Sequence, residues 1–122
     1  MSAFPQVGII VLNYNGKPCL ISCLESLDRL EYRNKDVIVV DNNSQDSSLQ
    51  ILSNYSSDHK NIKILPQSKN LGFSKGNNIG IEKSKGEYVA LLNNDCIAST
   101  NWLRESVNCA VKENNIFAVN SK

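Results

Sequence analysis

Apolar and polar positions alternate along this chain in blocks that predict strands and helices in turn. Largely apolar runs at 7–12, 36–40, 62–65 and 88–92 are typical of strands buried on both faces, and a shorter run at 116–119 predicts a fifth. Between these runs, apolar side chains recur every three or four residues, as on one face of a helix. The alternation predicts an α/β fold, with a mainly parallel sheet of about five strands and helices on both faces.

Polar and proline residues between the apolar runs predict where three of the helices begin or end. The first helix is expected over 18–30, because proline suits a first helical turn. Ser44 is predicted to cap the second helix, and 53–61 reads as a polar loop after it. Ser99 or Thr100 is predicted to cap the fourth helix in the same way. Tertiary packing of the apolar faces would then fix these helices on the sheet.

The third helix, expected from 70–73 to about Ser84, is unusual in its glycines. Gly72, Gly76 and Gly80 are spaced by four residues and share one helix face. Because each interior glycine costs roughly 1 kcal/mol relative to alanine, a close approach to the sheet or to a ligand is the expected reason. Gly86 is predicted as the C-terminal stop of this helix.

Length and charge place the chain in a broad class. A chain of 122 residues with a net charge of +1 predicts one domain, 1–122, with a sizeable core. The near-neutral balance gives no electrostatic case for nucleic acid. No run approaches the roughly 20 apolar residues of a membrane span, and no signal-peptide pattern opens the chain. We therefore expect a protein without a transmembrane segment, cytoplasmic or at the inner face of the membrane.

The cysteines and the single histidine do not predict a zinc site. Cys19, Cys23, Cys96 and Cys109 form no C-x-x-C pair, and His59 lies in a polar segment. Cys19 and Cys23 share a helix face and are interpreted as small core side chains in a reducing compartment.

Polar residues cluster where the predicted strands end. The segments 13–15, 41–43 and 93–95 follow strands directly, and 70–72 opens the third helix. Because the carboxyl ends of parallel strands meet at one edge of a sheet, these four segments are expected to lie together. That arrangement predicts a binding site for a polar ligand of several parts, such as a nucleotide.

Two carboxylates suggest what this ligand is. The chain has neither a G-x-G-x-x-G segment nor a P-loop, and its predicted edge carries little positive charge, so a diphosphate would need a cation. Asp95 is suited to hold Mg²⁺ or Mn²⁺, hard ions that share oxygen ligands with phosphates. Asp41 is suited to accept a hydrogen bond from the imide N–H of uracil or thymine.

Four motifs in order give the chain a family resemblance. They are Val11-Leu12-Asn13-Tyr14-Asn15-Gly16, Val39-Val40-Asp41-Asn42-Asn43-Ser44, the N-x-G-F-x-x-G-N-N segment from Asn70 to Asn78, and Leu91-Leu92-Asn93-Asn94-Asp95. The chain resembles the donor-binding half of family 2 glycosyltransferases of GT-A fold. The L-L-N-x-D variant is most similar to rhamnosyltransferase-type members, which build bacterial surface polysaccharides.

The resemblance implies a role for each matched position. Asp95 would bind the Mg²⁺ or Mn²⁺ ion that bridges the diphosphate of a UDP- or dTDP-sugar donor, for inverting transfer to a glycan or lipid-linked acceptor. The other matched residues would contact the nucleotide or shape its pocket; they are Asn13, Tyr14, Asn15, Asp41, Asn43, Asn70, Gly72, Asn77, Asn93 and Asn94. Self-association is also expected, because family members are longer and a missing half would expose apolar surface.

The sequence departs from the family pattern in two ways. Asn93 stands where the family's D-x-D motif has its first aspartate, which lowers the charge of the metal site. The family's general base is expected beyond Lys122, because Glu105 and Glu113 read as solvated helix positions. We therefore expect this chain to bind donor and metal but to transfer sugar poorly or not at all.

Three other classes are weighed against this reading. A receiver domain would have acidic residues after the first strand, where this chain has Asn13-Tyr14-Asn15, and a nucleotidyltransferase would have a basic, glycine-rich loop there. A non-catalytic nucleotide-binding module is left open. Among the aromatic residues, Tyr14 is equally suited to stacking on a base and to packing, whereas Phe73 and Trp102 are predicted to pack in the core.

Overall fold

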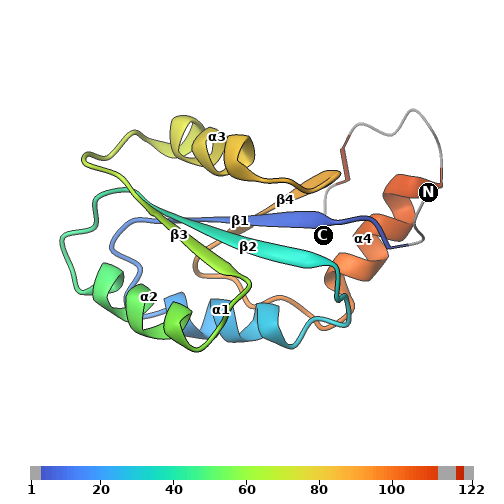
Figure 1. Cartoon of the computed structure of the whole chain (residues 1–122), viewed down its shortest axis with the longest axis horizontal. Coiled ribbons are helices and arrows are strands. Elements are labelled where there is room, and N and C mark those ends of the chain that lie inside the picture. The colour runs from blue at the N-terminus through green and yellow to red at the C-terminus, as the bar shows by residue number, and fades with distance from the viewer. Residues whose placement is uncertain (1–3, 113–117, 120–122) are drawn as a thin grey trace.

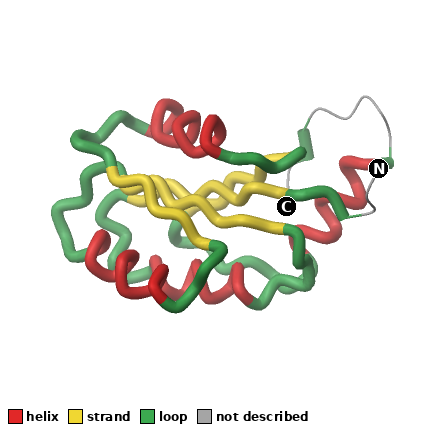
Figure 2. The backbone as a smooth tube through the Cα atoms, viewed as in Figure 1, coloured by secondary structure: helices red, strands yellow, loops and turns green. Residues whose placement is uncertain are grey.

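The computed structural model describes residues 4–112, 118 and 119 of the chain. Its helices and strands alternate along the chain (Figure 2): β1 Val7–Asn13, α1 Leu20–Asp28, β2 Lys35–Asp41, α2 Ser48–Ser57, β3 Ile62–Pro66, α3 Phe73–Lys83, β4 Tyr88–Asn93 and α4 Trp102–Val111. The fifth strand predicted at 116–119 falls largely outside the described residues. Within the described ranges, no helix combines the length and the apolarity that crossing a membrane requires.

The described strands form one parallel sheet in the order β3-β2-β1-β4. β1 lies between β2 and β4, with Asn13 opposite Asp41 and Leu12 opposite Asn93. The predicted parallel α/β fold is confirmed. However, β4 was expected to be buried on both faces as a central strand, and in the described sheet it is an edge strand with alternating exposure. The apolar run was misleading because a partly covered edge strand can be as apolar as a central one.

Helices cover both faces of the sheet (Figure 1). α1, α2 and α4 lie on one face and pack on side chains such as Ile9, Val11 and Val39, whereas α3 is the described helix on the other face, over Ile10 and Val40. This division follows from the strand period of two, which points neighbouring residues of β1 to opposite faces. α3 packs on β1 and β2. On the same face of the sheet, the side chains of Val89 and Leu91 in β4 are exposed.

The glycines of α3 allow its close approach to the sheet. A Cβ atom on Gly80 would lie 2.5 Å from Cγ2 of Ile10, and one on Gly76 would lie 2.5 Å from Cδ1 of Leu12. The prediction for these two glycines is confirmed. Gly72 differs, because a Cβ there would meet nothing within 4 Å; its φ of +85° just before the helix is what favours glycine.

The predicted boundaries of α3 are confirmed and those of α1 are within two residues, whereas the predicted caps and the end of α2 were wrong. α2 continues through Ser57, so the segment 53–57 is helical rather than loop, and its N-cap is Ser47 instead of Ser44. The N-cap of α4 is Asn101, and neither helix has a side-chain cap hydrogen bond. Gly86 is not a helix stop: a Cβ on it would lie 2.6 Å from the backbone nitrogen of Gly8, so close contact between two backbones requires glycine. Local polar residues gave a weak signal here because tertiary contacts set these boundaries.

Candidate functional site

The chain builds its sheet outward from β1 in two directions, first to β2 and β3 and then back across to β4. In open α/β sheets, ligands bind at such a reversal, outside the carboxyl ends of the strands. A cavity of about 290 Å³ opens at this position, between the ends of β1 and β4 and the start of α3. Its lining residues are Leu12, Tyr14, Phe73, Asn77, Leu91, Leu92, Asn93, Asn94 and Asp95.

Five of the predicted site residues line this cavity: Tyr14, Asn77, Asn93, Asn94 and Asp95. The cavity also includes Phe73, the first residue of α3, which is 64% exposed. The expectation that Phe73 packs in the core was therefore wrong, whereas Trp102 packs against the larger core cluster as expected. Phe73 sits where the helix begins, before its periodic inward face is established, and so helical periodicity gave no reliable signal for it.

Two of the predicted residues, Asn13 and Asp41, are buried and are not part of the cavity lining. They face each other at the ends of β1 and β2, with exposed fractions of 0% and 2%. Asn13 Nδ2 donates to Asp41 Oδ1 at 2.9 Å, and Asn94 Nδ2 donates to Asn13 Oδ1 at 2.9 Å. These two bonds join the ends of three strands. Asp41 also accepts the hydroxyl of Ser44 on Oδ1 and the backbone N–H of Ser44 on Oδ2.

Hydrogen bonds also join the loop after β1 to the loop after β2. Asn15 donates its backbone N–H to the Ser44 hydroxyl at 2.9 Å, and its side-chain oxygen accepts the backbone N–H of Gln45 at 2.7 Å. Asn15 and Asn43 have φ values of 53° and 64°, a left-handed conformation that asparagine tolerates better than most residues. These two predicted residues are outside the cavity lining.

The loop before α3 is held by a residue that the sequence analysis did not select. The side chain of Asn42, 2% exposed, accepts the backbone N–H of Leu71 and donates to the carbonyl of Gly72. Asn70 accepts the N–H of Gly72 at 2.8 Å and closes a tight turn. The position of Asn42, directly after Asp41 in the second motif, was the only sequence signal for this role.

Asp95 has the surroundings that a hard divalent cation requires at a shared site. It is exposed in the turn after β4, beside Asn93 and Asn94. Among the described residues, no group of three or more histidine, cysteine, aspartate or glutamate side chains gathers to hold a metal alone. Mg²⁺ and Mn²⁺ are commonly bound through one or two carboxylates together with substrate phosphates and water, so these residues fit a metal that arrives with its ligand.

The thiol of Cys23 lies close to this turn and is not part of the cavity lining. Cys23 on α1 is buried, and its Sγ lies 3.7 Å from the carbonyl oxygen of Asn93. Burial, and then the nearby Cys96, Cys19 and Asp95, raise the pKa of the Cys23 thiol to about 12. Cys23 is therefore a neutral packing group, as expected from its position on the inner face of α1.

The parallel sheet and the polar loops gathered at its carboxyl edge define a GT-A type α/β domain with a nucleotide-binding architecture. Comparison with known families gives the same result. The family described as Glycosyl transferase family 2 matches residues 8–121, and the chain belongs to this family.

Named relatives and solved structures support this assignment. An uncharacterized glycosyltransferase of Haemophilus influenzae is 33% identical over 121 residues, which are 99% of this chain and 38% of that protein. The crystal structure of Staphylococcus aureus TarS 1-349 in complex with UDP-GlcNAc matches with a TM-score of 0.77 and 27% identity, over 84% of this chain and 30% of that one. A mannosyltransferase of Pyrobaculum calidifontis, solved with GDP-Man and Mn²⁺, shares the fold with a TM-score of 0.84 at 21% identity, over 88% of this chain and 33% of that one. The chain therefore spans well under half the length of these proteins.

Proposed function

We propose that this chain is the donor-binding domain of a glycosyltransferase and binds a nucleoside-diphosphate sugar together with a divalent metal ion. The observation that carries the proposal is a cavity at the reversal point of the sheet, lined by the polar loops after β1 and β4 and by the first turns of α3, with the loop after β2 hydrogen-bonded to the loop after β1. The cavity has the exposed carboxylate of Asp95 at its mouth. The TarS structure solved with UDP-GlcNAc supports the choice of ligand class, because that protein shares 27% identity with this chain.

Asp41 is proposed to recognise the base. Its carboxylate already accepts two side-chain donors on Oδ1 and one backbone donor on Oδ2. Because a carboxylate offers about four lone-pair sites, Oδ2 keeps one for the imide N–H of uracil or thymine. The three protein donors hold the carboxylate in one orientation, so the fourth bond is preorganised. Cytosine has no imide N–H and would leave this site without its donor.

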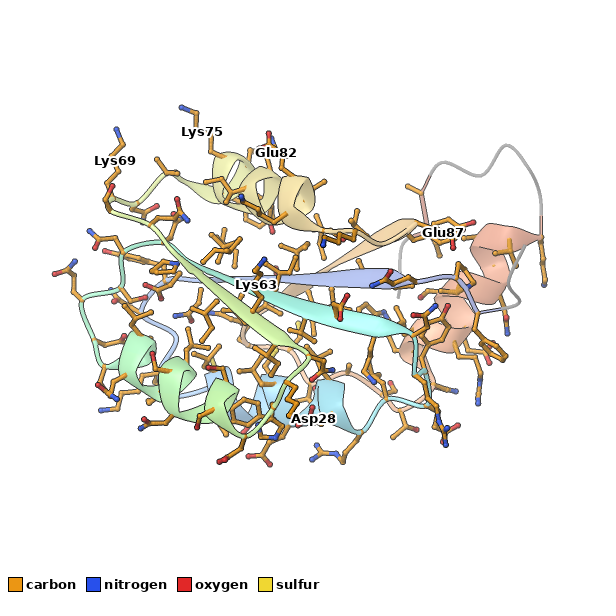
Figure 3. All side chains as sticks on the ribbon, viewed as in Figure 1. Asp28, Lys63, Lys69, Lys75, Glu82 and Glu87 are labelled. Atoms are coloured by element: carbon orange, nitrogen blue, oxygen red, sulfur yellow. The ribbon has the colours of Figure 1, made fainter. Side chains whose placement is uncertain are left out.

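Asp95 is proposed to hold Mg²⁺ or Mn²⁺ on the diphosphate, with Asn93 supplying a neutral oxygen or a bond to the sugar. A bound metal would neutralise the charge that develops on the departing diphosphate. The residues at this edge of the sheet include few cations to replace it: in Figure 3, Lys69 and Lys75 extend outward from the loop after β3 and from α3. The aromatic rings of Tyr14 and Phe73 border the same cavity and are suited to stack on flat or apolar ligand faces.

The proposed reaction is inverting transfer of the sugar to an acceptor hydroxyl of a glycan or lipid-linked acceptor. In such a transfer, the hydroxyl oxygen attacks the anomeric carbon, the nucleoside diphosphate leaves, and a base takes the hydroxyl proton. Glu105 is exposed on α4, with its Oε1 3.8 Å from Nε of Arg104, in keeping with a solvated helix position. The proposal therefore assigns no general base among the described residues.

A receiver domain is not a competing proposal. Receiver domains have the strand order 2-1-3-4-5, in which the first and third strands are neighbours, whereas here β1 lies between β2 and β4. A non-catalytic nucleotide-binding module would have the same site geometry. It would differ from a glycosyltransferase only in not transferring a sugar to an acceptor.

Thermal unfolding with UDP, dTDP, GDP and CDP, each with and without Mn²⁺, tests the proposal. We expect UDP or dTDP to raise the midpoint temperature when Mn²⁺ is present, because a ligand that binds only the folded state stabilises it. CDP should have a smaller effect, because cytosine lacks the imide N–H. Absence of any shift with all four nucleotides at millimolar concentration would contradict the proposal.

A further inference from the structure

The side chain of Asn13 joins parts of the site that come from three different strands. It is the last residue of β1 and is fully buried. Its oxygen accepts Asn94 Nδ2 at 2.9 Å, and its nitrogen donates to Asp41 Oδ1 at 2.9 Å and to the Ser44 hydroxyl at 3.2 Å. Asn94 directly precedes Asp95. The amide of Asn13 therefore connects the proposed base-recognising carboxylate to the turn that carries the proposed metal ligand.

The amide satisfies both sides of this connection, because it donates to Asp41 and accepts from Asn94. A carboxylate at position 13 has no donor for Asp41 and would place two negative groups in contact, and an apolar side chain would leave the buried Asp41 without one of its donors. The backbone at Gly16 packs directly against the hydrogen bond between Asn13 and Asn94. A Cβ atom on Gly16 would lie 2.2 Å from Asn13 Oδ1 and 2.3 Å from Asn94 Nδ2, so only glycine allows the loop to close over the bond.

We propose that Asn13 is a positioning residue, which sets the distance between Asp41 and the 93–96 turn so that one nucleotide can engage both. This inference rests on the proposed function. It replaces the expectation that Asn13 contacts the nucleotide directly, because the amide nitrogen of Asn13 already donates to both Asp41 and Ser44 and its oxygen accepts Asn94, whereas Asp41 Oδ2 accepts one donor only among the described residues. A ligand held at two ends binds tightly only when the separation of the ends is correct, as in any linked pair of contacts.

The proposal makes a specific prediction about coupling between metal and nucleotide. In the parent chain, Mn²⁺ strengthens the binding of UDP because the diphosphate and Asp95 share the ion. In N13L, which is similar in size but makes neither bond, Mn²⁺ should strengthen UDP binding about tenfold less than in the parent, within the usual range of coupling between sites. Binding of UDP without metal should also weaken, because Asp41 loses one of its three protein donors, so the readout is the ratio of the UDP dissociation constants with and without Mn²⁺.

Isothermal titration calorimetry of UDP, with and without Mn²⁺, measures this coupling on the 122-residue chain. N94A removes the other half of the connection and should reproduce the effect, and the double variant N13L/N94A should be no worse than either single variant. N54L, at an exposed site on α2, is the matched control and should behave like the parent. If N13L does not fold, N94A still tests the proposal. Asn94 is only half-buried, so its replacement should disturb folding less than a change at the fully buried Asn13.

The outcomes separate this inference from the function on which it rests. If the parent chain binds no UDP in either condition, the proposed function fails and the positioning role falls with it. If the parent shows coupling and a folded N13L or N94A keeps the full effect of Mn²⁺, the positioning role alone is overturned. A loss of metal coupling in N13L and N94A but not in N54L supports it.

Discussion

Asparagine side chains build the rim of this site because an amide both donates and accepts hydrogen bonds. Asn13 connects Asp41 to the turn after β4, and Asn42 holds the loop before α3 through both of its polar atoms. Asn15 and Asn43 adopt left-handed backbone conformations in the two loops above them. The asparagines at or directly after the ends of β1, β2 and β4 thus hold the loops of this edge together.

Cys23 gives a prediction at the residue scale. Because burial and its neighbours raise the pKa of its thiol to about 12, its thiolate fraction at pH 8 should be about a thousandfold lower than that of a thiol with an ordinary pKa. Iodoacetamide labelling of the native chain at pH 8, followed by peptide mass spectrometry, should modify the exposed Cys109 long before Cys23. Equal labelling rates for the two in the folded chain would contradict this account, and denatured protein serves as the control.

The sequence indicated which polar segments meet at one edge of the sheet but not how deep each side chain lies. The position of Asp95 at this edge could be predicted, because a polar segment that follows an apolar strand leaves the sheet at its carboxyl end. The burial of Asn13 and the exposure of Phe73 could not be predicted, since both depend on how loops from distant parts of the chain close over one another. Asn42 was missed because a buried amide that holds a neighbouring loop looks, in sequence, like any other loop asparagine.

At the scale of elements, the close packing of α3 on the sheet gives a second prediction. Gly80→Ala should gain roughly 1 kcal/mol of helix propensity but lose more, because a Cβ at 2.5 Å from Ile10 Cγ2 overpacks the core at a typical cost of about 1–3 kcal/mol. Chemical denaturation should therefore give a lower free energy of unfolding for G80A. Asn78→Ala, at an exposed position of the same helix, is the control and should be neutral or slightly stabilising. A stabilised G80A would show that α3 does not pack as described.

The ends of α1 and α2 meet in a second polar cluster, away from the proposed site. Asp28 Oδ2 accepts the hydroxyl of Tyr55 and lies 3.0 Å from Nε2 of His59, and the rings of Tyr55 and His59 stack at 3.8 Å. In Figure 3, Asp28 lies on the α1 and α2 side of the sheet. Burial, and then the bond to Asp28, raise the pKa of Tyr55 well above its ordinary value.

This cluster predicts how stability changes in alkali. Because the folded state keeps Tyr55 neutral, its favourable contribution is complete below about pH 10 and is lost as pH rises further, since the unfolded chain then releases the phenol proton first. The free energy of unfolding should therefore fall above about pH 10, and Tyr55→Phe should make this fall less steep while costing about 1 kcal/mol at pH 7 through its lost bond. Urea denaturation at pH 7, 9 and 11 measures both effects, with the exposed Tyr14→Phe as control. An unchanged slope in Y55F would contradict the assignment.

Strands were easier to predict than helix ends, for a physical reason. The predicted run at 7–12 matches β1 to within one residue, because a parallel strand needs a continuous apolar stretch to be buried between helices. Ser44 was predicted as a helix cap, yet its hydroxyl is used by Asp41 and Asn15 in the site. A polar residue that serves the loop network is indistinguishable in sequence from one that caps a helix.

At the scale of the whole molecule, the order of the strands locates the site. The described sheet places the ends of β1, β2 and β4 side by side, which brings Asp41 and the turn bearing Asp95 to the same edge. The alternation of elements predicted a parallel sheet, but it could not show that β4 lies at the edge of the described strands, because strand order depends on crossovers that leave no local pattern. The exposed apolar side chains of β4, Val89 and Leu91, are the consequence of that order.

Nuclear magnetic resonance mapping of UDP and Mg²⁺ on the ¹⁵N-labelled chain tests the central claim most directly. The account predicts that backbone amide shifts change in the loops 13–16, 41–46, 70–73 and 93–96, which converge at the carboxyl edge of the sheet. Amides at the opposite edge, in 33–35, 59–61 and 85–87, should stay unchanged. Shift changes concentrated at that opposite edge, or no changes at all, would contradict the claim that this edge of the sheet binds a nucleotide.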